Sequence, residues 1–195
     1  VVATQSFINP SFGPRGLSLL ENGLTPELAV KTLLELDEGR KVRQLAILDV
    51  HGNVEAYTGE NCIVEAGHFV GNNFSVQANL MDKNTVWPAM AEAFKNAKGT
   101  LAERMLQAME AAQKEGGDIR GKQSAAILVV KAKSTGNEWE DKIVDLRVED
   151  NPNPIQEMRR LLTIHSAYEF MNKGDLAVEK GNNVLAKEHY MNAQK

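Results

Sequence analysis

Short apolar runs separated by turn residues fill the first half of the chain, which is the pattern of strands joined by tight connections. The segment "RQLAILDV" (Arg43–Val50) is apolar on both faces, which predicts a strand that is covered on both sides. A turn at residues 51–53 and the returning segment "VEAYTG" predict a hairpin. A further strand is predicted at "FSVQANLM" (Phe74–Met81).

Helix-start signals separate these strands. Thr25 offers a capping hydroxyl before a proline and an acid, which predicts a helix to about Glu38. Thr100 and Glu103 form a capping box that predicts a helix ending at Gly116. The other predicted elements are a helix near Trp87–Asn96, strands at Ser124–Lys133 and Ile143–Val148, and a helix from about Pro154. Hairpins beside paired helices predict a layered α+β domain and not a βαβ nucleotide fold.

The C-terminal residues 164–195 have a different pattern, in which small and aromatic residues recur at the spacing of one tetratricopeptide repeat. These residues are Phe170, Gly174, Ala177, Gly181, Ala186, Tyr190 and Ala193. The pattern resembles that repeat family and predicts a helical hairpin at residues 164–195, after a main domain at residues 1–163. Phe170 replaces the usual tryptophan, Lys173 replaces the usual leucine, and the closing proline would lie beyond Lys195. We expect further repeats or a capping role, because one repeat cannot bury its own face.

Composition and charge narrow the function classes. The 195 residues are 43% apolar with a net charge of −4, which argues against nucleic-acid binding. Cys62 is the single cysteine, and the four histidines are scattered without a metal-binding spacing, so we expect no metal site. No dinucleotide or P-loop glycine motif occurs, and no cofactor is expected. No apolar run reaches the roughly 18 residues of a membrane span.

Polar residues at strand ends are the candidates for chemistry. Gln77 and Asn79 lie two apart and therefore share one face of a predicted strand, where they could hold a ligand or donate to an oxyanion. The alternative is an amide face that pairs with backbone or meets solvent. Thr58 is a candidate hydroxyl ligand or a simple strand end. His68 could pair with the Cys62 thiol, although a buried structural cysteine is the favoured interpretation.

The segment "GGDIRGKQSAAILVV" (Gly116–Val130) begins as a charged, glycine-rich loop and ends as a strand. Its glycines suit a helix stop and a sharp turn into that strand. Asp118 and Arg120 either form a local ion pair or clamp the charged ends of a zwitterionic substrate, since aspartate matches ammonium and arginine matches carboxylate. The sequence leaves these two alternatives open.

Several separated blocks together resemble an uncharacterised bacterial and archaeal family of the N-terminal-nucleophile (Ntn) hydrolase-like superfamily. They are "ATQSFINPSFGPRGL", "RQLAILDVHGNVEAYTG", "AGH", "SVQANLM", "GGDIRGKQSAAILVV" and the closing "VDLRVEDNPNPIQEMRRLL". The resemblance covers about residues 1–163, with Ala78 standing where the family usually has glycine. It implies an αββα sandwich of two antiparallel sheets. It also implies a preceding strand pair that begins with a Thr-Phe-Ser-like segment, which we expect either upstream of Val1 or on another chain.

Members of that superfamily cleave amide bonds with the hydroxyl or thiol of the first mature residue, and the free α-amine acts as base. The resemblance therefore implies an amidohydrolase for a small or peptide-like amide, with its nucleophile upstream of this chain. Gln77 and Asn79 would act near the carbonyl, and Asp118, Arg120, Thr58 and His68 would bind substrate. The alternative is a non-catalytic scaffold that self-associates as a homo-oligomer and recruits a protein partner through its C-terminal repeat. The sequence leaves the compartment open between secreted, periplasmic and cytoplasmic.

Overall fold

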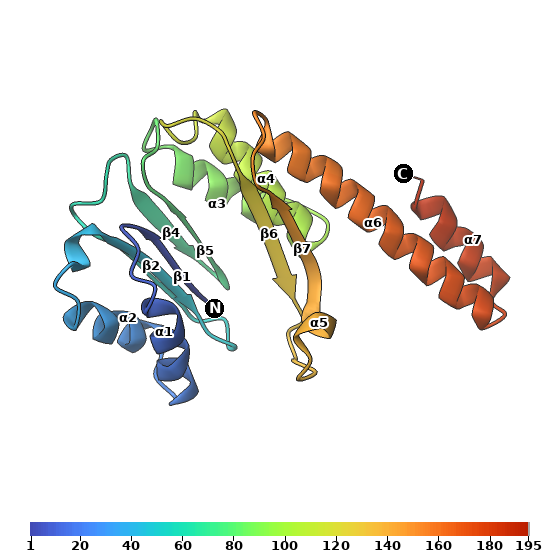
Figure 1. The fold of residues 1–195 in the computed structure, drawn as a ribbon, viewed down its shortest axis with the longest axis horizontal. Helices are drawn as coiled ribbons and strands as arrows, with labels where there is room; N and C mark the ends of the chain where they lie inside the picture. The colour runs from blue at the N-terminus through green and yellow to red at the C-terminus, as the bar shows by residue number, and fades with distance from the viewer. Residues whose placement is uncertain (195) are drawn as a thin grey trace. The chain divides into compact units, whose positions relative to one another are not determined.

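The computed structural model describes residues 1–194 as an α+β protein with three small antiparallel sheets (Figure 1). Two compact units divide the chain. The first contains Val1–Ala97 and Gln107–Gly121, and the second contains Lys98–Leu106 and the residues from Lys122 onward. None of the described helices is long and apolar enough to cross a membrane.

A three-stranded antiparallel sheet begins the first unit. Its strands, in spatial order, are β1 (Val2–Ser6), β2 (Arg43–Leu48) and β3 (Val54–Thr58). The predicted hairpin is confirmed, with Leu48 opposite Val54 and Gly52 in the left-handed region at φ 86°. Asp49 closes the turn, because its carboxylate accepts from the Asn53 side chain at 2.8 Å.

Helices α1 (Phe12–Glu21) and α2 (Pro26–Glu35) pack on one face of this sheet and bury its apolar side. The fully buried centre of that core comprises Phe12, Ala29, Leu33, Leu45 and Ile47. The predicted start of α2 is confirmed, since Thr25 Oγ1 accepts from the Leu28 amide at 3.3 Å. The helix ends at Glu35, three residues earlier than expected.

A second, two-stranded sheet consists of β4 (Gly67–Gly71) and β5 (Phe74–Ala78). The sequence pattern missed β4, because glycines at both of its ends and one histidine leave too few apolar positions for a strand signal. β5 ends at Ala78 and not at Met81 as predicted, because Leu80 adopts φ 60°. Helix α3 (Val86–Asn96) covers the outer face, where the Phe74 and Phe94 rings are 4.7 Å apart.

The second unit contains the hairpin of β6 (Ala125–Val130) and β7 (Lys142–Val148) and the start of α4 (Leu101–Lys114). The predicted capping box is confirmed: the Thr100 amide donates to Glu103 Oε2 at 2.6 Å, and the Glu103 amide donates to Thr100 Oγ1 at 3.3 Å. A single helical turn, α5 (Glu138–Asp141), lies between β6 and β7.

Helices α6 (Pro154–Glu179) and α7 (Asn183–Asn192) form the predicted C-terminal pair. The helices approach closely because Gly174 leaves room for the ring of Tyr190, which a Cβ atom would meet at 2.4 Å. The Tyr190 hydroxyl then donates to Asp175 Oδ1 at 2.6 Å. Because α6 is one continuous helix, it crosses the predicted domain boundary after residue 163 without a break.

Candidate binding pocket and its polar layer

A row of polar side chains crosses the three-stranded sheet on the face opposite the apolar core. Gln5 of β1 lies opposite Gln44 of β2, and Gln44 lies opposite Thr58 of β3. Side chains alternate along a strand, so these residues point away from α1 and α2. They face β4 and β5, where His68 and Gln77 lie opposite each other.

Gln44 is the centre of this layer and is completely buried. Its amide nitrogen contacts the carbonyl oxygens of Gly67 at 3.1 Å and Ala78 at 2.9 Å, and Thr58 Oγ1 at 3.0 Å. Its Oε1 accepts from Asn79 Nδ2 at 3.0 Å. Carbonyl oxygens only accept, so the two backbone partners determine which end of the amide carries nitrogen. One side chain thus joins both sheets of the first unit.

Thr58 links Gln44 to His68, whose Nδ1 lies 2.8 Å from the Thr58 hydroxyl. Burial lowers the pKa of His68 below its usual value, and the nearby Glu55 charge offsets part of that effect. The imidazole is therefore neutral at pH 7. The Thr58 hydroxyl either donates to Nδ1 or accepts from it, according to which ring nitrogen carries the proton.

A pocket of about 380 Å³ opens beside this layer in the first unit. Polar side chains dominate its lining, and two methionines supply an apolar wall. The lining residues are Gln5, Ser6, Gln77, Ala78, Asn79, Leu80, Met81, Met90, Asp118 and Arg120. This size suits a small molecule rather than a large cofactor.

The loop after α4 reaches this pocket because backbone hydrogen bonds attach it to the segment after β5. The Ile119 amide donates to the Leu80 carbonyl at 2.9 Å, and the Asp82 amide donates to the Gly117 carbonyl at 2.9 Å. Gly117 adopts φ 73°, and two further glycines of the loop also lie in the left-handed region. The glycines therefore shape the turn that brings Asp118 to the pocket.

Asp118 and Arg120 form a bidentate ion pair at the pocket. Arg120 Nε and Nη2 donate to the two Asp118 oxygens at 3.0 and 2.5 Å. The side-chain hydrogen bond from Arg120 holds the pKa of Asp118 below its usual value. The Arg120 side chain is 69% exposed and that of Asp118 is 27% exposed. The arginine thus faces solvent, and the carboxylate lies deeper.

The structure brings four of the predicted site residues to one pocket and two to the adjacent layer. Gln77, Asn79, Asp118 and Arg120 line the pocket. Thr58 and His68 contact each other but do not line it, and Gln44 connects them to Asn79.

Sequence reasoning missed Gln44 and Gln5, which are central to the layer and the pocket. Gln44 directly precedes the apolar run Leu45–Leu48, and the apolar pattern of that strand gives no indication of a polar role. The sequence does contain one signal: Gln44 directly precedes Leu45, and neighbouring side chains of a strand point to opposite faces of the sheet. Gln44 therefore lies on the face opposite the apolar core.

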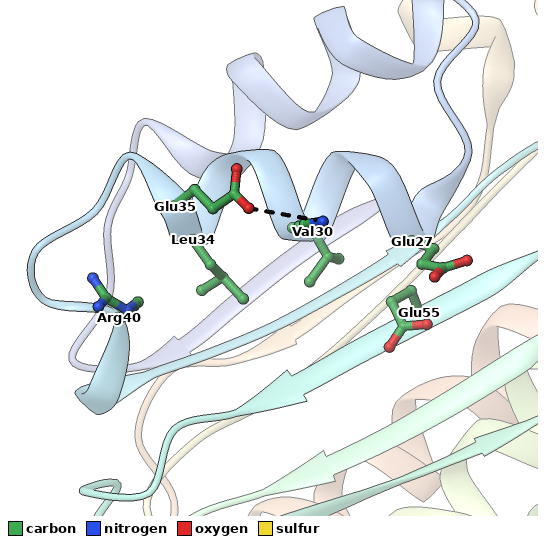
Figure 2. Close-up of a pocket in the computed structure, with 7 residues that line it drawn as sticks. Glu27, Val30, Leu34, Glu35, Arg40 and Glu55 are labelled. Atoms are coloured by element: carbon green, nitrogen blue, oxygen red, sulfur yellow. Dashed lines mark ion pairs between the residues drawn. The ribbon is translucent and has the colours of Figure 1, made fainter.

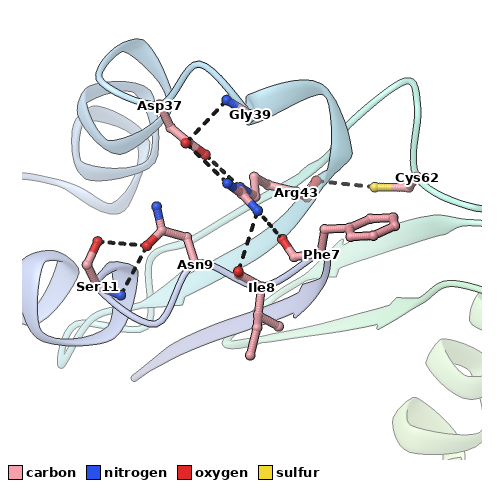
Figure 3. A network of polar contacts seen from close by, with 8 residues as sticks. All are labelled: Phe7, Ile8, Asn9, Ser11, Asp37, Gly39, Arg43 and Cys62. Atoms are coloured by element: carbon pink, nitrogen blue, oxygen red, sulfur yellow. Dashed lines mark hydrogen bonds and ion pairs between the residues drawn. The ribbon is translucent and has the colours of Figure 1, made fainter.

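Cys62 belongs to a separate anchoring network and not to a thiol–imidazole pair (Figure 3). Its sulfur donates to the Arg43 carbonyl at 3.3 Å, and the thiol is buried. The Arg43 guanidinium holds Asp37 at 2.7 Å and donates to the Phe7 carbonyl at 2.6 Å. His68 Nδ1 contacts Thr58 instead. The buried structural cysteine is therefore the correct interpretation of the two that the sequence allows.

A larger hollow of about 550 Å³ lies on the outer surface between α2 and β3 (Figure 2). Glu27, Glu35 and Glu55 line it, and Lys31 Nζ lies 3.9 Å from Glu35 Oε1. Within residues 1–194, no three His, Cys, Asp or Glu side chains are grouped closely enough to hold a metal ion. The smaller pocket is the better candidate because Asn79, which lines it, is hydrogen-bonded to the buried polar layer through Gln44.

Comparison with known proteins gives a family without an assigned activity. A family model described as "Family of unknown function (DUF1028)" matches residues 1–158. The chain is also similar to the crystal structure of protein SPO2555 from Silicibacter pomeroyi, with 32% sequence identity and a TM-score of 0.72. That similarity covers 83% of this chain and 70% of the other, which is described as a member of the same family. The search of curated proteins finds no match.

Proposed function

The chain belongs to the DUF1028 family, and for this member we propose an Ntn-hydrolase-like amidohydrolase that binds a small or peptide-like amide in the pocket of Gln77, Asn79, Asp118 and Arg120. The observation that carries the proposal is this pocket. It collects amide side chains and one ion pair beside a layer of buried polar groups that joins two sheets. Convergent polar groups in a small concave site are typical of substrate pockets.

The layer order of the first unit supports the αββα sandwich that such an activity would use. Helices α1 and α2 cover one face of the β1–β2–β3 sheet, and Gln44 connects its other face to β4 and β5. Helix α3 packs on the far side of β4 and β5, where Gly67 makes room for the Trp87 ring. Figure 1 shows the two sheets of this unit with helices on their outer sides.

In the proposed reaction, the hydroxyl or thiol of the mature N-terminal residue attacks the amide carbon. Its proton passes through the free α-amine to the leaving amine, and water then hydrolyses the acyl intermediate. That residue belongs to a segment ahead of Val1, as the resemblance to Ntn hydrolases implies. Gln77 and Asn79 hydrogen-bond the substrate near the reacting group, and Asp118 with Arg120 holds its charged ends.

The proposal is tested on the natural full-length protein. Sequencing of the mature N-terminus should find Thr, Ser or Cys, and a broad screen of small amides should detect release of ammonia or amine. Arg120→Lys should weaken substrate binding at least tenfold if the arginine holds a carboxylate bidentately, whereas a purely local ion pair would tolerate lysine. No turnover of any amide in that screen would refute the hydrolase.

A second candidate function is assembly through the C-terminal helix pair, with a tetratricopeptide-like role in binding a partner or a second copy. The observation that favours it is a set of exposed apolar side chains on α6 and α7, including Tyr168 at 60% and Val184 at 84% exposure. Light scattering should show an oligomer that Tyr168→Lys or Val184→Lys dissociates. A monomer for all three proteins, together with no partner bound by the helix pair, would count against assembly.

A further inference from the structure

We propose that Ser6 is a further ligand-binding residue of the pocket and that its hydroxyl hydrogen-bonds the amide group of the substrate. This inference rests on the proposed function, because it adds a contact to the ligand of the same pocket. Two observations support it: the backbone is strained at the pocket lining, and the Ser6 hydroxyl has no partner among the described residues.

The pocket contains backbone conformations that are unfavourable for residues with a side chain. Within residues 1–194, three residues other than glycine have a φ in the left-handed region: Ser6 at 61°, Asn73 at 62° and Leu80 at 60°. Asn73 occupies the turn between β4 and β5, and asparagine tolerates this conformation. Serine and leucine do not share that preference, and both Ser6 and Leu80 line the pocket. Backbone strain of this kind concentrates at ligand-binding sites.

Hydrogen bonds from distant segments hold Ser6 in its conformation. Ser6 is the last residue of β1 and lies opposite Arg43. The Phe7 amide donates to the Val42 carbonyl at 3.3 Å, and the Phe7 carbonyl accepts from Arg43 Nη1 at 2.6 Å. Because Asp37 holds the Arg43 guanidinium at 2.7 Å, the backbone is anchored on both sides of Ser6. The surrounding structure therefore imposes the strain at Ser6.

The Ser6 hydroxyl is available to a ligand. Ser6 is partly buried in the pocket lining, and no residue among 1–194 hydrogen-bonds its side chain. Ser75, by contrast, uses its hydroxyl within the protein, where it accepts from Gln77 Nε2 at 2.7 Å. A hydroxyl both donates and accepts, as do the side-chain amides of Gln77 and Asn79. This neutral set of groups suits the neutral amide of the substrate, which offers a carbonyl acceptor and an N–H donor.

The experiment measures the binding of glycylglycine, a zwitterionic peptide amide, to the natural full-length protein by calorimetry and NMR. Ser6→Ala removes the hydroxyl and keeps a residue with a Cβ atom at this position. It should weaken binding about three- to tenfold, which is the contribution of one hydrogen bond. Ser18→Ala changes an exposed serine of α1 as the matched control, and it should leave the affinity unchanged. Circular dichroism and the melting temperature show that each variant is folded.

Ser6→Gly tests the role of the strain. It removes the hydroxyl and also the cost of the left-handed conformation, which glycine adopts freely. Its melting temperature should be at least that of Ser6→Ala, whereas its affinity for glycylglycine should fall at least as far. Asn73→Gly releases the same conformation at a residue outside the pocket lining, and it should keep the full affinity. A Ser6→Gly variant that binds as tightly as the natural protein would overturn the inference.

Alkylation locates the ligand without relying on a change of affinity. Cys62 is the single natural cysteine and is buried, so the Ser6→Cys variant carries one accessible thiol, which iodoacetamide should alkylate. Glycylglycine at about ten times its dissociation constant should slow this reaction about tenfold, because a bound ligand covers the thiol. The matched Ser18→Cys variant should react at the same rate with and without the peptide. Unchanged alkylation of Ser6→Cys would place the ligand away from Ser6 and contradict the inference.

The outcomes separate this inference from the proposed function. If neither glycylglycine nor any amide of the broad screen binds the natural protein, the proposed function fails and the inference fails with it. If only another amide of the screen binds, that amide replaces glycylglycine as the probe. If the probe binds and the folded Ser6→Ala variant binds it equally well, the pocket stands and the inference about Ser6 fails. Weaker binding by both Ser6 variants, with unchanged binding by both controls, supports it.

Discussion

The two faces of the β1–β2–β3 sheet are built from the same strands and use opposite chemistry. The face toward α1 and α2 buries Leu45 and Ile47 in an apolar core. The opposite face carries Gln44, which is as deeply buried but makes hydrogen bonds to β4, β5 and Asn79. Neighbouring residues of β2 therefore serve different purposes: one side holds the unit together, and the other positions polar groups beside the pocket.

This difference follows from what each kind of burial demands. An apolar side chain is stabilised by leaving water, and many arrangements of neighbours satisfy it. A buried amide is tolerated only if its donors and acceptors all find partners, which restricts its geometry tightly. The polar face consequently specifies positions more precisely, whereas the apolar face contributes more to the free energy of folding.

The largest expected effect comes from the apolar face. Leu45→Ala should lower the free energy of unfolding by about 3 kcal/mol, because it removes a fully buried side chain from a packed core. Urea unfolding measures the loss. The pocket lies on the other side of the sheet, so the affinity of the pocket for its ligand should stay unchanged. A change in that affinity would show that the two faces of the sheet are not independent.

Gln44→Met should cost about 2 kcal/mol, because the buried carbonyls of Gly67 and Ala78 lose their side-chain donor. Unlike the previous change, it should also free the Asn79 side chain and weaken ligand binding. NMR of the Asn79 side-chain amide and calorimetry follow both effects. Unchanged binding in a folded variant would contradict the positioning role of Gln44.

The end of the apolar face is closed by the ion pair of Arg43 and Asp37, whose side chains are 18% and 11% exposed. The side-chain hydrogen bond from Arg43 holds the pKa of Asp37 below its usual 3.8. Asp37→Asn should therefore cost about 1–2 kcal/mol at pH 7. The stabilising effect is complete above pH 3.8 and is lost as the pH falls through the lowered pKa.

Unfolding titrations at pH 7 and pH 3 test this pair. The stabilities of the natural protein and the Asp37→Asn variant should differ less at pH 3 than at pH 7, because the unfolded state takes up a proton below pH 3.8. Asp118→Asn is the matched control, since its arginine partner is mostly exposed, and it should change the stability little. A constant difference between pH 7 and pH 3 would assign the effect to packing and not to charge.

The smallest effect concerns His68 in the polar face. Burial lowers its pKa below 6.5, and the Glu55 charge raises it in part. Folding therefore disfavours the imidazolium, and stability should decline as the pH falls from 6.5 toward the lowered pKa. Glu55→Gln should lower the His68 pKa further, because it removes the charge that raises it, and NMR titration of the ring measures the change. A rise would show that another charge controls this histidine.

Local signals in the sequence were sufficient for much of the fold. The Thr25 cap, the Thr100 and Glu103 capping box and the hairpin after Arg43–Val50 depend on neighbouring residues, and the structure confirms each of them. The small-residue spacing around Gly174 likewise predicted the α6–α7 pair. Such features are visible in sequence because the interacting groups are only a few residues apart or recur with a period.

Polar contacts between distant segments could not be predicted from such local signals. Strand alternation placed Gln77 and Asn79 on one face, and the loop pattern selected Asp118 and Arg120. The role of Gln44 depends on partners 14 to 35 residues away, and no local pattern reports them. β4 was missed for a related reason, because its pairing with β5 compensates for a weak strand signal.

The sequence by itself determined the element types, the caps, the turns and which side chains share a strand face, since these follow from backbone geometry and the alternation of side chains. The tertiary structure decided which polar residues meet, because hydrogen bonds are directional and need groups brought together from distant segments. It placed Asp118 at the strand end that carries Asn79, and it made Gln44 the link between two sheets. The sequence allowed the candidate residues to be selected individually, but only the tertiary structure shows that they line one pocket.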